Sequence, residues 1–426
     1  MNIKSIKSNS PKHFQLSSFS GYLLLSYLFL TIWISSILGQ SQPADSLLLL
    51  QQVNSLIQKG NYATAHIFLE EYIEQHGMRP DLTTMMIANG LTHYYRHENY
   101  EFFLLKDTEQ VTPALNNSKP NNIRIGRLRY PQRILENLLQ QNPDYAYIYK
   151  LLGDYYDIQL QDLNNFEFAK PNNIKILEEK IFTYYSQADI KGYEDFYTCR
   201  WLGDYYANNN QLDLAEKYYQ RNVTKSISDP ISLYRLAEIN FQKKLYTQAY
   251  NYAQASIKHF PGEDIYLKYD ALRISANSLK ELGEYDRFLE IINESIQLIP
   301  DLQDGYLDLI QFYSSPMQSE KIESLYNEMF MKNPFELSGY RSFENYIVNS
   351  ENYQFADTLF NSMLLKYENW DEVLANIYWS KGNLAYYQKL AEESSRFWEI
   401  SRNYMKRYLP ANHSLIKQVG SIALKK

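Results

Sequence analysis

The sequence predicts an all-α protein in which about nine helix pairs stack into an α-α superhelix. The first observation is a series of small or apolar residues at intervals of 34, 39, 34 and 34: Ala215, Ala249, Phe288, Ile322 and Ala356. The second is a proline 12 residues after three of them: Pro261, Pro300 and Pro334. A fixed period near 34 residues is typical of stacked helix pairs, and proline ends a helix that it cannot continue.

The composition narrows the class of protein. At 426 residues the chain is too long for one ordinary core, so repeated stacking is the simpler architecture. The 40 tyrosines exceed ordinary usage, and we interpret many of them as large rings that fill the space between neighbouring helices. A net charge of −7 argues against binding to nucleic acid, and the single cysteine, Cys199, excludes an intramolecular disulfide.

The amino terminus predicts export. Residues 1–20 carry three lysines and no acid, and residues 21–38 (GYLLLSYLFLTIWISSIL) carry no charge. Gly39 and a polar stretch follow, which is the order of a secretory signal over residues 1–39. Because the apolar run is also long enough to span a bilayer, a retained membrane anchor is the alternative. In either case we expect the body outside the cytoplasm, in the periplasm, the cell envelope or the medium.

The regular array is expected over residues 226–368. It contains four predicted helix pairs, with helices at 231–243, 246–259, 267–282, 284–298, 302–313, 321–331, 337–348 and 353–365. A tyrosine stands three residues before the periodic residue in three second helices (Tyr246, Tyr285 and Tyr353). The turn within a pair is expected to use Gly or Asn, which tolerate left-handed backbone angles.

Similar turns predict further pairs at both ends. Gly60-Asn61-Tyr62 marks one within an amino-terminal repeat segment, 44–110, and Glu98-Asn99-Tyr100 marks a second. Gly382-Asn383-Leu384 marks another in a degenerate carboxyl-terminal segment, 369–426, that ends in a capping helix near 392–408.

The segment 111–225 contains a duplication. Leu151-Leu152-Gly153-Asp154-Tyr155-Tyr156 recurs 50 residues later as Trp201-Leu202-Gly203-Asp204-Tyr205-Tyr206. Lys119–Ile125 (KPNNIRI) recurs 51 residues later as Lys170–Ile176 (KPNNIKI), and its asparagines are suited to helix amino-terminal caps. The longer unit predicts extended loops at about 106–122 and 160–172.

These motifs resemble the tetratricopeptide repeat. Leu152-Gly153 with Tyr156, and Leu202-Gly203 with Tyr206, match its Leu-Gly-x-x-Tyr pattern. Ala215 with Tyr219 matches its Ala-x-x-x-aromatic pattern, and Ala249 with Pro261 matches its closing distance. The resemblance covers about 44–410. It implies a right-handed superhelix whose first helices line a concave surface that binds peptides or protein partners without catalysis.

The resemblance also bears on the candidate site. Some members that bind chaperones clamp a terminal carboxylate with Lys and Asn. Here Asp154 and Asp204 follow the repeat glycines, and an acid at that place repels a carboxylate. Lys150 and Arg200 stand where a basic clamp residue could stand.

The predicted partner-binding residues form two trios at helical spacing: Tyr147, Lys150 and Asp154, and then Tyr197, Arg200 and Asp204. One interpretation is a repeated binding surface. The other is an ion pair between residues four apart, packed beside tyrosines, which stabilises a helix only slightly.

We predict no metal, cofactor or catalytic site. His93 and His97 are four apart on an expected helix, but no third ligand accompanies them, so we interpret them as solvated or close to a helix cap. Cys199 is interpreted as a small buried hydrophobe, because it stands three residues before Leu202, where the repeat carries an aromatic.

The function predicted from the sequence is that of an exported, non-enzymatic scaffold that binds a protein or peptide. The alternative is a carbohydrate-binding module that stacks sugars on Trp370, Trp379 and Trp398, which requires these rings to be exposed together. An enzyme with its site in the inserted loops is the third and weakest hypothesis.

Overall fold

The computed structural model of the chain describes residues 44–108, 124–164, 171–225, 229–260, 264–314 and 318–423. The predicted signal segment 1–39 and most of the predicted loop 106–122 lie outside these ranges. Within them, no helix is both long and apolar enough to cross a membrane. The contacts divide the chain into unit 1 (Met1–Lys225) and unit 2 (Ser226–Lys426).

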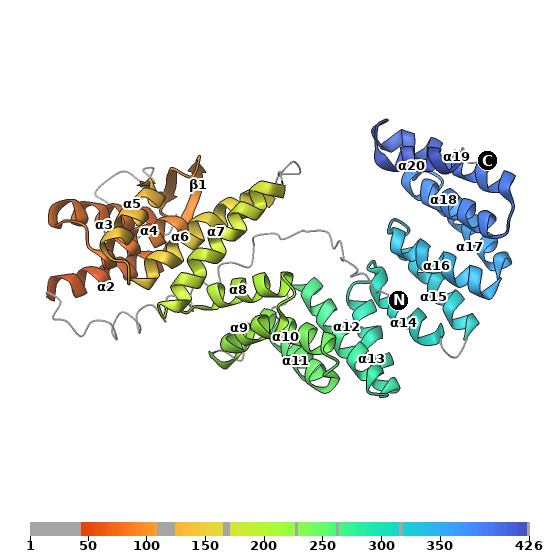
Figure 1. The fold of residues 1–426 in the computed structure, drawn as a ribbon, viewed down its shortest axis with the longest axis horizontal. Helices are drawn as coiled ribbons and strands as arrows, with labels where there is room; N and C mark the ends of the chain where they lie inside the picture. The colour runs from red at the N-terminus through yellow and green to blue at the C-terminus, as the bar shows by residue number, and fades with distance from the viewer. Residues whose placement is uncertain are drawn as a thin grey trace. The chain divides into compact units, whose positions relative to one another are not determined.

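Unit 2 consists of antiparallel helix pairs. The helices are α10 (Pro230–Gln242), α11 (Tyr246–His259), α12 (Ile265–Glu281), α13 (Tyr285–Leu298), α14 (Gln303–Ser314), α15 (Ser319–Lys332), α16 (Leu337–Ser350), α17 (Tyr353–Lys366), α18 (Asp371–Tyr387), α19 (Ala391–Tyr408) and α20 (Ser414–Ala423). Each first helix packs on the second helix of its pair (Figure 1). The first helices of neighbouring pairs are also in contact: α14 contacts α16, and α16 contacts α18. The predicted all-α repeat array is confirmed.

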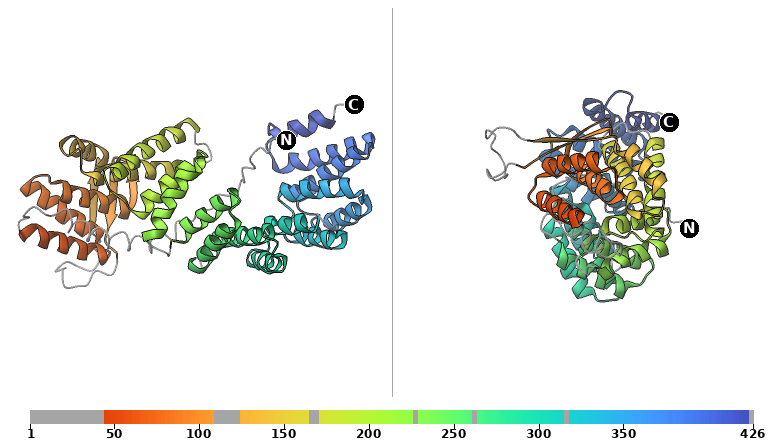
Figure 2. Two further views of the ribbon diagram at one scale, coloured as in Figure 1. Left: turned by 60° about the horizontal axis from the view of Figure 1, so that its bottom comes forward. Right: turned by 90° about the vertical axis from the view of Figure 1, so that its left-hand side faces the viewer.

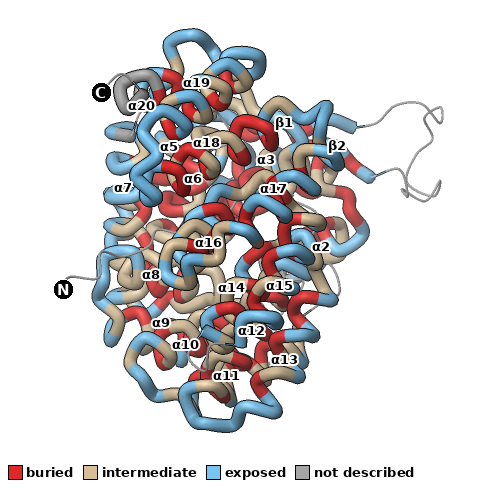
Figure 3. The backbone as a smooth tube through the Cα atoms, turned by 90° about the vertical axis from the view of Figure 1, so that its right-hand side faces the viewer, coloured by how far each residue is buried: buried red, intermediate tan, exposed pale blue. Residues whose placement is uncertain are grey.

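The periodic residues lie where the pairs close. Ala249, Phe288, Ile322 and Ala356 are all buried, each in the second helix of its pair. Tyrosines contribute large rings to the core, as expected, and six are among the largest fully buried side chains: Tyr185, Tyr219, Tyr269, Tyr306, Tyr326 and Tyr340. Buried stretches, red in Figure 3, alternate with exposed ones along the helices.

Unit 1 combines helix pairs with a small sheet (Figure 2). Its elements are α2 (Ala44–Gln58), α3 (Tyr62–His76), α4 (Pro80–His93), β1 (Tyr94–Glu98), β2 (Phe102–Lys106), β3 (Ile125–Arg129), α5 (Pro131–Gln141), α6 (Ala146–Asn164), α7 (Pro171–Ile190), α8 (Phe196–Asn208) and α9 (Leu212–Lys225). The duplicated motifs lie in α6 and α8, the first helices of the pairs α6–α7 and α8–α9.

The sheet corrects the predicted helical turn at Glu98-Asn99-Tyr100. These residues join two antiparallel strands in the sheet order β1-β2-β3, and Asn99 and Tyr100 both have left-handed φ angles. Strands β2 and β3 alternate buried side chains with more exposed ones, and Phe103, Leu105 and Leu128 are buried. Period-two alternation, which we did not recognise in the sequence, is the pattern of a half-buried strand.

Of the first copy of the duplicated KPNN motif, only Arg124 and Ile125 lie within the described ranges. Ile125 begins β3, whereas the matching Ile176 of the second copy lies inside α7. Ile125 takes strand structure because β3 pairs with β2, whereas Ile176 continues a helix. Both ends of the predicted loop at 160–172 are helical instead, because α6 continues to Asn164 and α7 starts at Pro171.

Gly382-Asn383-Leu384 is not a turn. These residues lie inside α18, and a Cβ at Gly382 would stand 2.4 Å from Cδ1 of Trp398. The turn follows the helix, where Lys389 has a φ of 64°. Gly382 therefore serves close packing of α18 on α19 rather than chain reversal.

Candidate functional site

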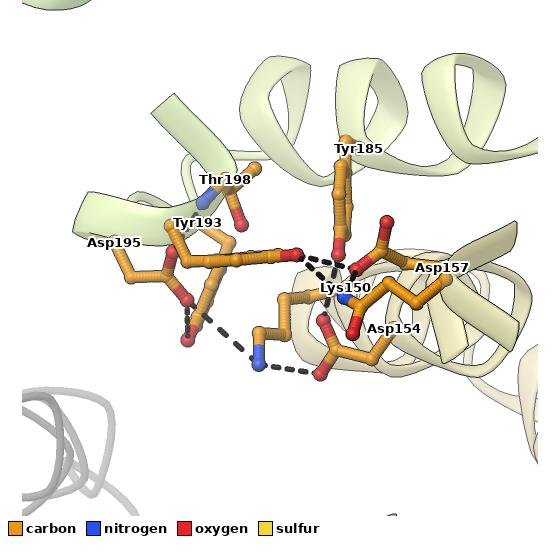
Figure 4. A network of polar contacts seen from close by, with 9 residues as sticks. Lys150, Asp154, Asp157, Tyr185, Tyr193, Asp195 and Thr198 are labelled. Atoms are coloured by element: carbon orange, nitrogen blue, oxygen red, sulfur yellow. Dashed lines mark hydrogen bonds and ion pairs between the residues drawn. The ribbon is translucent and has the colours of Figure 1, made fainter. Parts of the chain in front are cut away.

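Lys150 and Asp154 of the first predicted trio lie in a polar network between α6, α7 and the start of α8 (Figure 4). Lys150 Nζ lies 2.5 Å from Asp154 Oδ2 and 3.9 Å from Asp195 Oδ2. The side chains of Lys150 and Asp154 are only 17% and 18% exposed. Burial alone would lower the pKa of Lys150, but the two carboxylates raise it above its ordinary value, so the ammonium stays charged.

Tyrosine hydroxyls complete the network. Tyr185 OH donates to Asp154 Oδ1 at 2.9 Å, and Tyr193 OH donates to Asp195 Oδ2 at 2.9 Å. Asp195 also caps α8, because its Oδ1 accepts from the backbone N–H of Thr198 at 2.7 Å. The network joins three elements through charges that are already paired.

Asp157 is a neighbouring buried carboxylate that the sequence analysis did not single out. It is 6% exposed and accepts from Tyr197 OH and from Gln161 Nε2. Burial raises its pKa to about 6, although the bonds from Tyr197 and Gln161 oppose that rise. Its place one helical turn beyond Asp154, on the same face of α6, was the signal available in the sequence.

The remaining residues of the two trios pack against rings. Tyr147 lies with its ring centroid 5.3 Å from that of Tyr193. Arg200 lies over the ring of Tyr197, 5.9 Å from its centroid. The side chains of the two trios thus contact their own neighbours, and contact with a partner stays a prediction.

The two Asp residues after the repeat glycines share one arrangement. A Cβ at Gly153 would stand 2.3 Å from Cε1 of Tyr185, whose hydroxyl reaches Asp154. A Cβ at Gly203 would likewise stand 2.6 Å from Cε1 of Tyr219, whose hydroxyl donates to Asp204 Oδ1 at 2.6 Å. In each pair the glycine admits a ring from the second helix and the following carboxylate receives its hydroxyl.

The two histidines do not share a helix, contrary to the sequence prediction. His93 ends α4 and stacks on Tyr62 with a centroid separation of 3.9 Å, and burial lowers its pKa to about 4. His97 lies in β1, and its Nε2 lies 2.7 Å from Asp162 Oδ2. Within the described ranges, no group of three His, Cys, Asp or Glu side chains is placed to hold a metal ion.

Cys199 is 2% exposed, which confirms its interpretation as a buried small side chain.

The requirement for three tryptophans exposed together is not met. Trp370 is 55% exposed, but Trp398 is 7% exposed and its indole N–H donates to Asn383 Oδ1 at 3.1 Å. Trp379 packs against the core cluster that contains Trp398. The predicted sugar-stacking platform of these three rings is therefore wrong.

Unit 2 contains an open cavity of about 460 Å³ between α14, α15 and α16. Its lining is uncharged, with four residues from α14, three from α15 and five from α16: Leu307, Ile310, Gln311, Ser314, Ser319, Ile322, Tyr326, Ser342, Asn345, Tyr346, Asn349 and Ser350. Asn345 and Asn349 are exposed and one turn apart on α16. Nothing in the sequence marks this cavity, because its polar lining residues carry no charge and form no motif.

No family model matches the sequence, and no curated protein matches it. Among solved structures it is similar to a tetratricopeptide repeat protein from Parabacteroides merdae, with 15% identity over 69% of this chain and 91% of that chain and a TM-score of 0.35. It is also similar to the Pseudomonas aeruginosa pilF protein, with 10% identity over 53% of this chain and 96% of that chain and a TM-score of 0.39. A third similar structure is YrrB, described as a TPR protein with an unusual peptide-binding site. It has 17% identity over 41% of this chain and 79% of that chain, and a TM-score of 0.33. With TM-scores this low, the fold assignment rests on the helix pairs of this chain.

Proposed function

We propose that this chain is an exported, non-enzymatic repeat scaffold that binds an extended segment of a partner protein. The cavity between α14, α15 and α16 carries the proposal. Its first helices, α14 and α16, supply nine of its twelve lining residues. A partly apolar cavity with a few polar groups is the usual form of a binding site.

The lining indicates what kind of segment fits. The side chains of Asn345, Asn349 and Gln311 each present an amide that both donates and accepts. Main-chain amides of an extended peptide need both kinds of partner. Because none of the lining residues is charged, binding through this cavity favours neutral segments with small apolar side chains.

The polar clusters of unit 1 fit a scaffold better than an enzyme. The carboxylates around Lys150 pair with an ammonium or accept from tyrosines, and these contacts hold α6, α7 and α8 together. The export part of the proposal depends on residues 1–39, with cleavage after Gly39 as the first alternative and a retained anchor as the second.

The cavity is tested with Asn345→Ala/Asn349→Ala. The matched control is Asn327→Ala/Asn361→Ala, which removes two exposed amides of α15 and α17 that do not line the cavity. A photo-crosslinker at position 345 should trap a partner in cells, and purified partner should bind the cavity variant at least roughly tenfold more weakly, as expected when two hydrogen bonds are lost. Equal affinity for wild type and both variants would refute the role of the cavity.

The export proposal has its own measurement. Mass spectrometry of the mature amino terminus, combined with cell fractionation, should find a chain that begins after Gly39 in the envelope or the medium. An intact amino terminus in the membrane fraction would support the anchor instead. An intact chain in the cytoplasmic fraction would contradict export.

A further inference from the structure

The sheet of unit 1 has one face turned away from the helices. Phe103, Leu105 and Leu128 point to α3 and α4 on the covered face. Since side chains alternate along a strand, the neighbours of these residues form the opposite face. Arg96, Leu104 and Arg127 form one row across the three strands, Glu98, Phe102 and Arg129 form a second, and Lys106 and Ile125 form a third. We call this set the basic sheet face.

The charge of this face is opposite to that of the chain. All four of its cations are exposed in a protein of net charge −7. On the face itself Glu98 lies 4.0 Å from Arg127, and Arg129 also attracts the carboxylate of Glu70 of α3. At its rim, Glu101 lies 3.9 Å from Arg133 of α5. Exposed ion pairs at such distances are weak, so these cations remain available to a partner.

Aromatic rings hold the cations in place. Arg127 lies over Phe102 at 5.3 Å, and Lys106 lies over Tyr95 at 5.3 Å. At the rim, Arg133 lies over Tyr130 at 4.9 Å. A guanidinium stacked on a ring keeps its N–H edge directed outward, in the geometry that receives a carboxylate with two hydrogen bonds.

The same contacts favour a protein partner over a single-stranded nucleic acid. Single-stranded nucleic acids bind open sheets by stacking bases on exposed ring faces. Here the cations already occupy a face of Phe102, of Tyr95 and of Tyr130. Carboxylates need the guanidinium edges rather than the rings, so stacked arginines suit them.

We propose that the basic sheet face binds an extended acidic segment of a partner protein, with carboxylates at alternate positions that meet Arg127 and Arg129. These two arginines are two residues apart on β3, so their side chains are separated by about 7 Å along the strand. Alternate residues of any extended segment have the same separation. The surface belongs to unit 1 and is distinct from the cavity of unit 2, so this proposal does not depend on the proposed function.

The experiment compares the full chain with Arg127→Glu/Arg129→Glu and a control of equal charge change, Lys175→Glu/Lys217→Glu. The control residues are exposed in α7 and α9 of the same unit. The probes are fluorescent peptides of about ten residues, at most roughly 35 Å long, that alternate Glu with Thr or Gln with Thr. Oligouridine is the third probe. Fluorescence anisotropy gives each affinity, and circular dichroism checks folding.

We expect the Glu-Thr peptide to bind wild type and the control alike, to bind the sheet variant at least roughly tenfold more weakly, and to lose affinity in salt. The Gln-Thr peptide should bind none of them measurably. Equal binding of the Glu-Thr peptide to the sheet variant and the control would overturn the proposal. Tighter binding of oligouridine than of the Glu-Thr peptide would overturn it in favour of a nucleic-acid surface. If the sheet variant is misfolded, Arg129→Gln replaces it and should weaken binding in the same direction.

Discussion

At the scale of single residues, burial determines the chemistry of the polar groups more than their identity does. Lys150 and Asp154 sit four apart on α6, a spacing that on an exposed helix gives a weak ion pair. Their burial changes the consequence of losing one partner, because the remaining charge would then be buried without compensation. Position in the fold, rather than the pair itself, makes these residues important for stability.

Asp157 allows a prediction with a definite sign. Its pKa is about 6 in the folded chain and near the ordinary value of 3.8 when unfolded. Between these values the folded state holds a proton that the unfolded state has lost, so this group makes folding less favourable as pH rises from 4 to 6. Asp157→Asn removes this pH-dependent contribution to the free energy of folding, while the amide oxygen can still accept a hydrogen bond from Tyr197 OH.

We therefore expect the unfolding free energy of Asp157→Asn, minus that of wild type, to increase by roughly 2 kcal/mol between pH 4 and pH 7. Urea denaturation of both proteins across this range measures it. His66 and His93, whose pKa values burial lowers to about 4, impose the opposite trend, but they do so in both proteins and cancel. A difference that is independent of pH would show that Asp157 is already ionised at pH 4.

At the scale of elements, one turn recurs between the helices of a pair. The backbone N–H of the third residue after the helix donates to a carbonyl five residues back, at 2.8 to 2.9 Å: Asn61 to Leu56, Gln211 to Tyr206, Leu245 to Asn240, Glu284 to Leu279 and Leu390 to Ala385. The residue before each donor has a left-handed φ: Gly60, Asn210, Lys244, Gly283 and Lys389. This is the Schellman arrangement, which ends a helix and reverses the chain.

The Gly and Asn that we expected in this turn are present at three of the five positions, and lysine occupies the other two. Lysine in a left-handed conformation costs about 1–2 kcal/mol, whereas glycine adopts it freely but loses more entropy on folding. Lys244→Gly should therefore stabilise unit 2 by roughly 0.5–1 kcal/mol in thermal or urea unfolding. Lys243→Gly, one residue earlier at φ −76°, should instead destabilise it. Equal effects at the two positions would contradict this account.

Another element-scale feature could not be read from sequence. Asn61 precedes α3 without making a side-chain cap, and Asp107, at the end of β2, supplies that cap from 43 residues away. Its Oδ1 accepts from the backbone N–H of Thr64 at 3.0 Å and its Oδ2 from the Thr64 hydroxyl at 2.5 Å. The cap ties the sheet to α3, because a carboxylate near a helix amino terminus is favoured by both hydrogen bonding and the helix dipole.

At the scale of the whole molecule, each unit has its own core cluster. Leu69, Ile87 and Leu152 belong to the cluster of unit 1, and Phe288, Phe330 and Phe360 belong to that of unit 2. Repeat arrays are held by contacts between neighbouring pairs, so damage to one pair weakens its neighbours first.

Gly153→Ala tests this locality. Its methyl group would meet the ring of Tyr185 at 2.3 Å, so overpacking should cost about 1–3 kcal/mol despite the better helix propensity of alanine. Hydrogen exchange should accelerate in α6 and α7 and stay unchanged in α14 to α17 of unit 2. If Gly153→Ala stabilised the protein, the close contact between Gly153 and the ring of Tyr185 would be contradicted. If exchange rose equally in both units, the chain would unfold as one cooperative body.

The sequence by itself determined the helix pairs, their limits in the regular array and the burial of the periodic residues. These depend on hydrophobic spacing, on prolines that stop helices and on turn residues, all of which act over a few positions. The predicted helix 246–259 coincides with α11, and the predicted helix 337–348 ends only two residues before α16 does.

Only the tertiary structure decided the sheet, the remote cap from Asp107, the network around Lys150 and the basic sheet face. Arg96 and Arg127 are ordinary isolated cations in the sequence, and they share a row only because β1 and β3 both pair with β2. Such groupings arise from pairing between distant segments, and local patterns carry no record of which segments will pair.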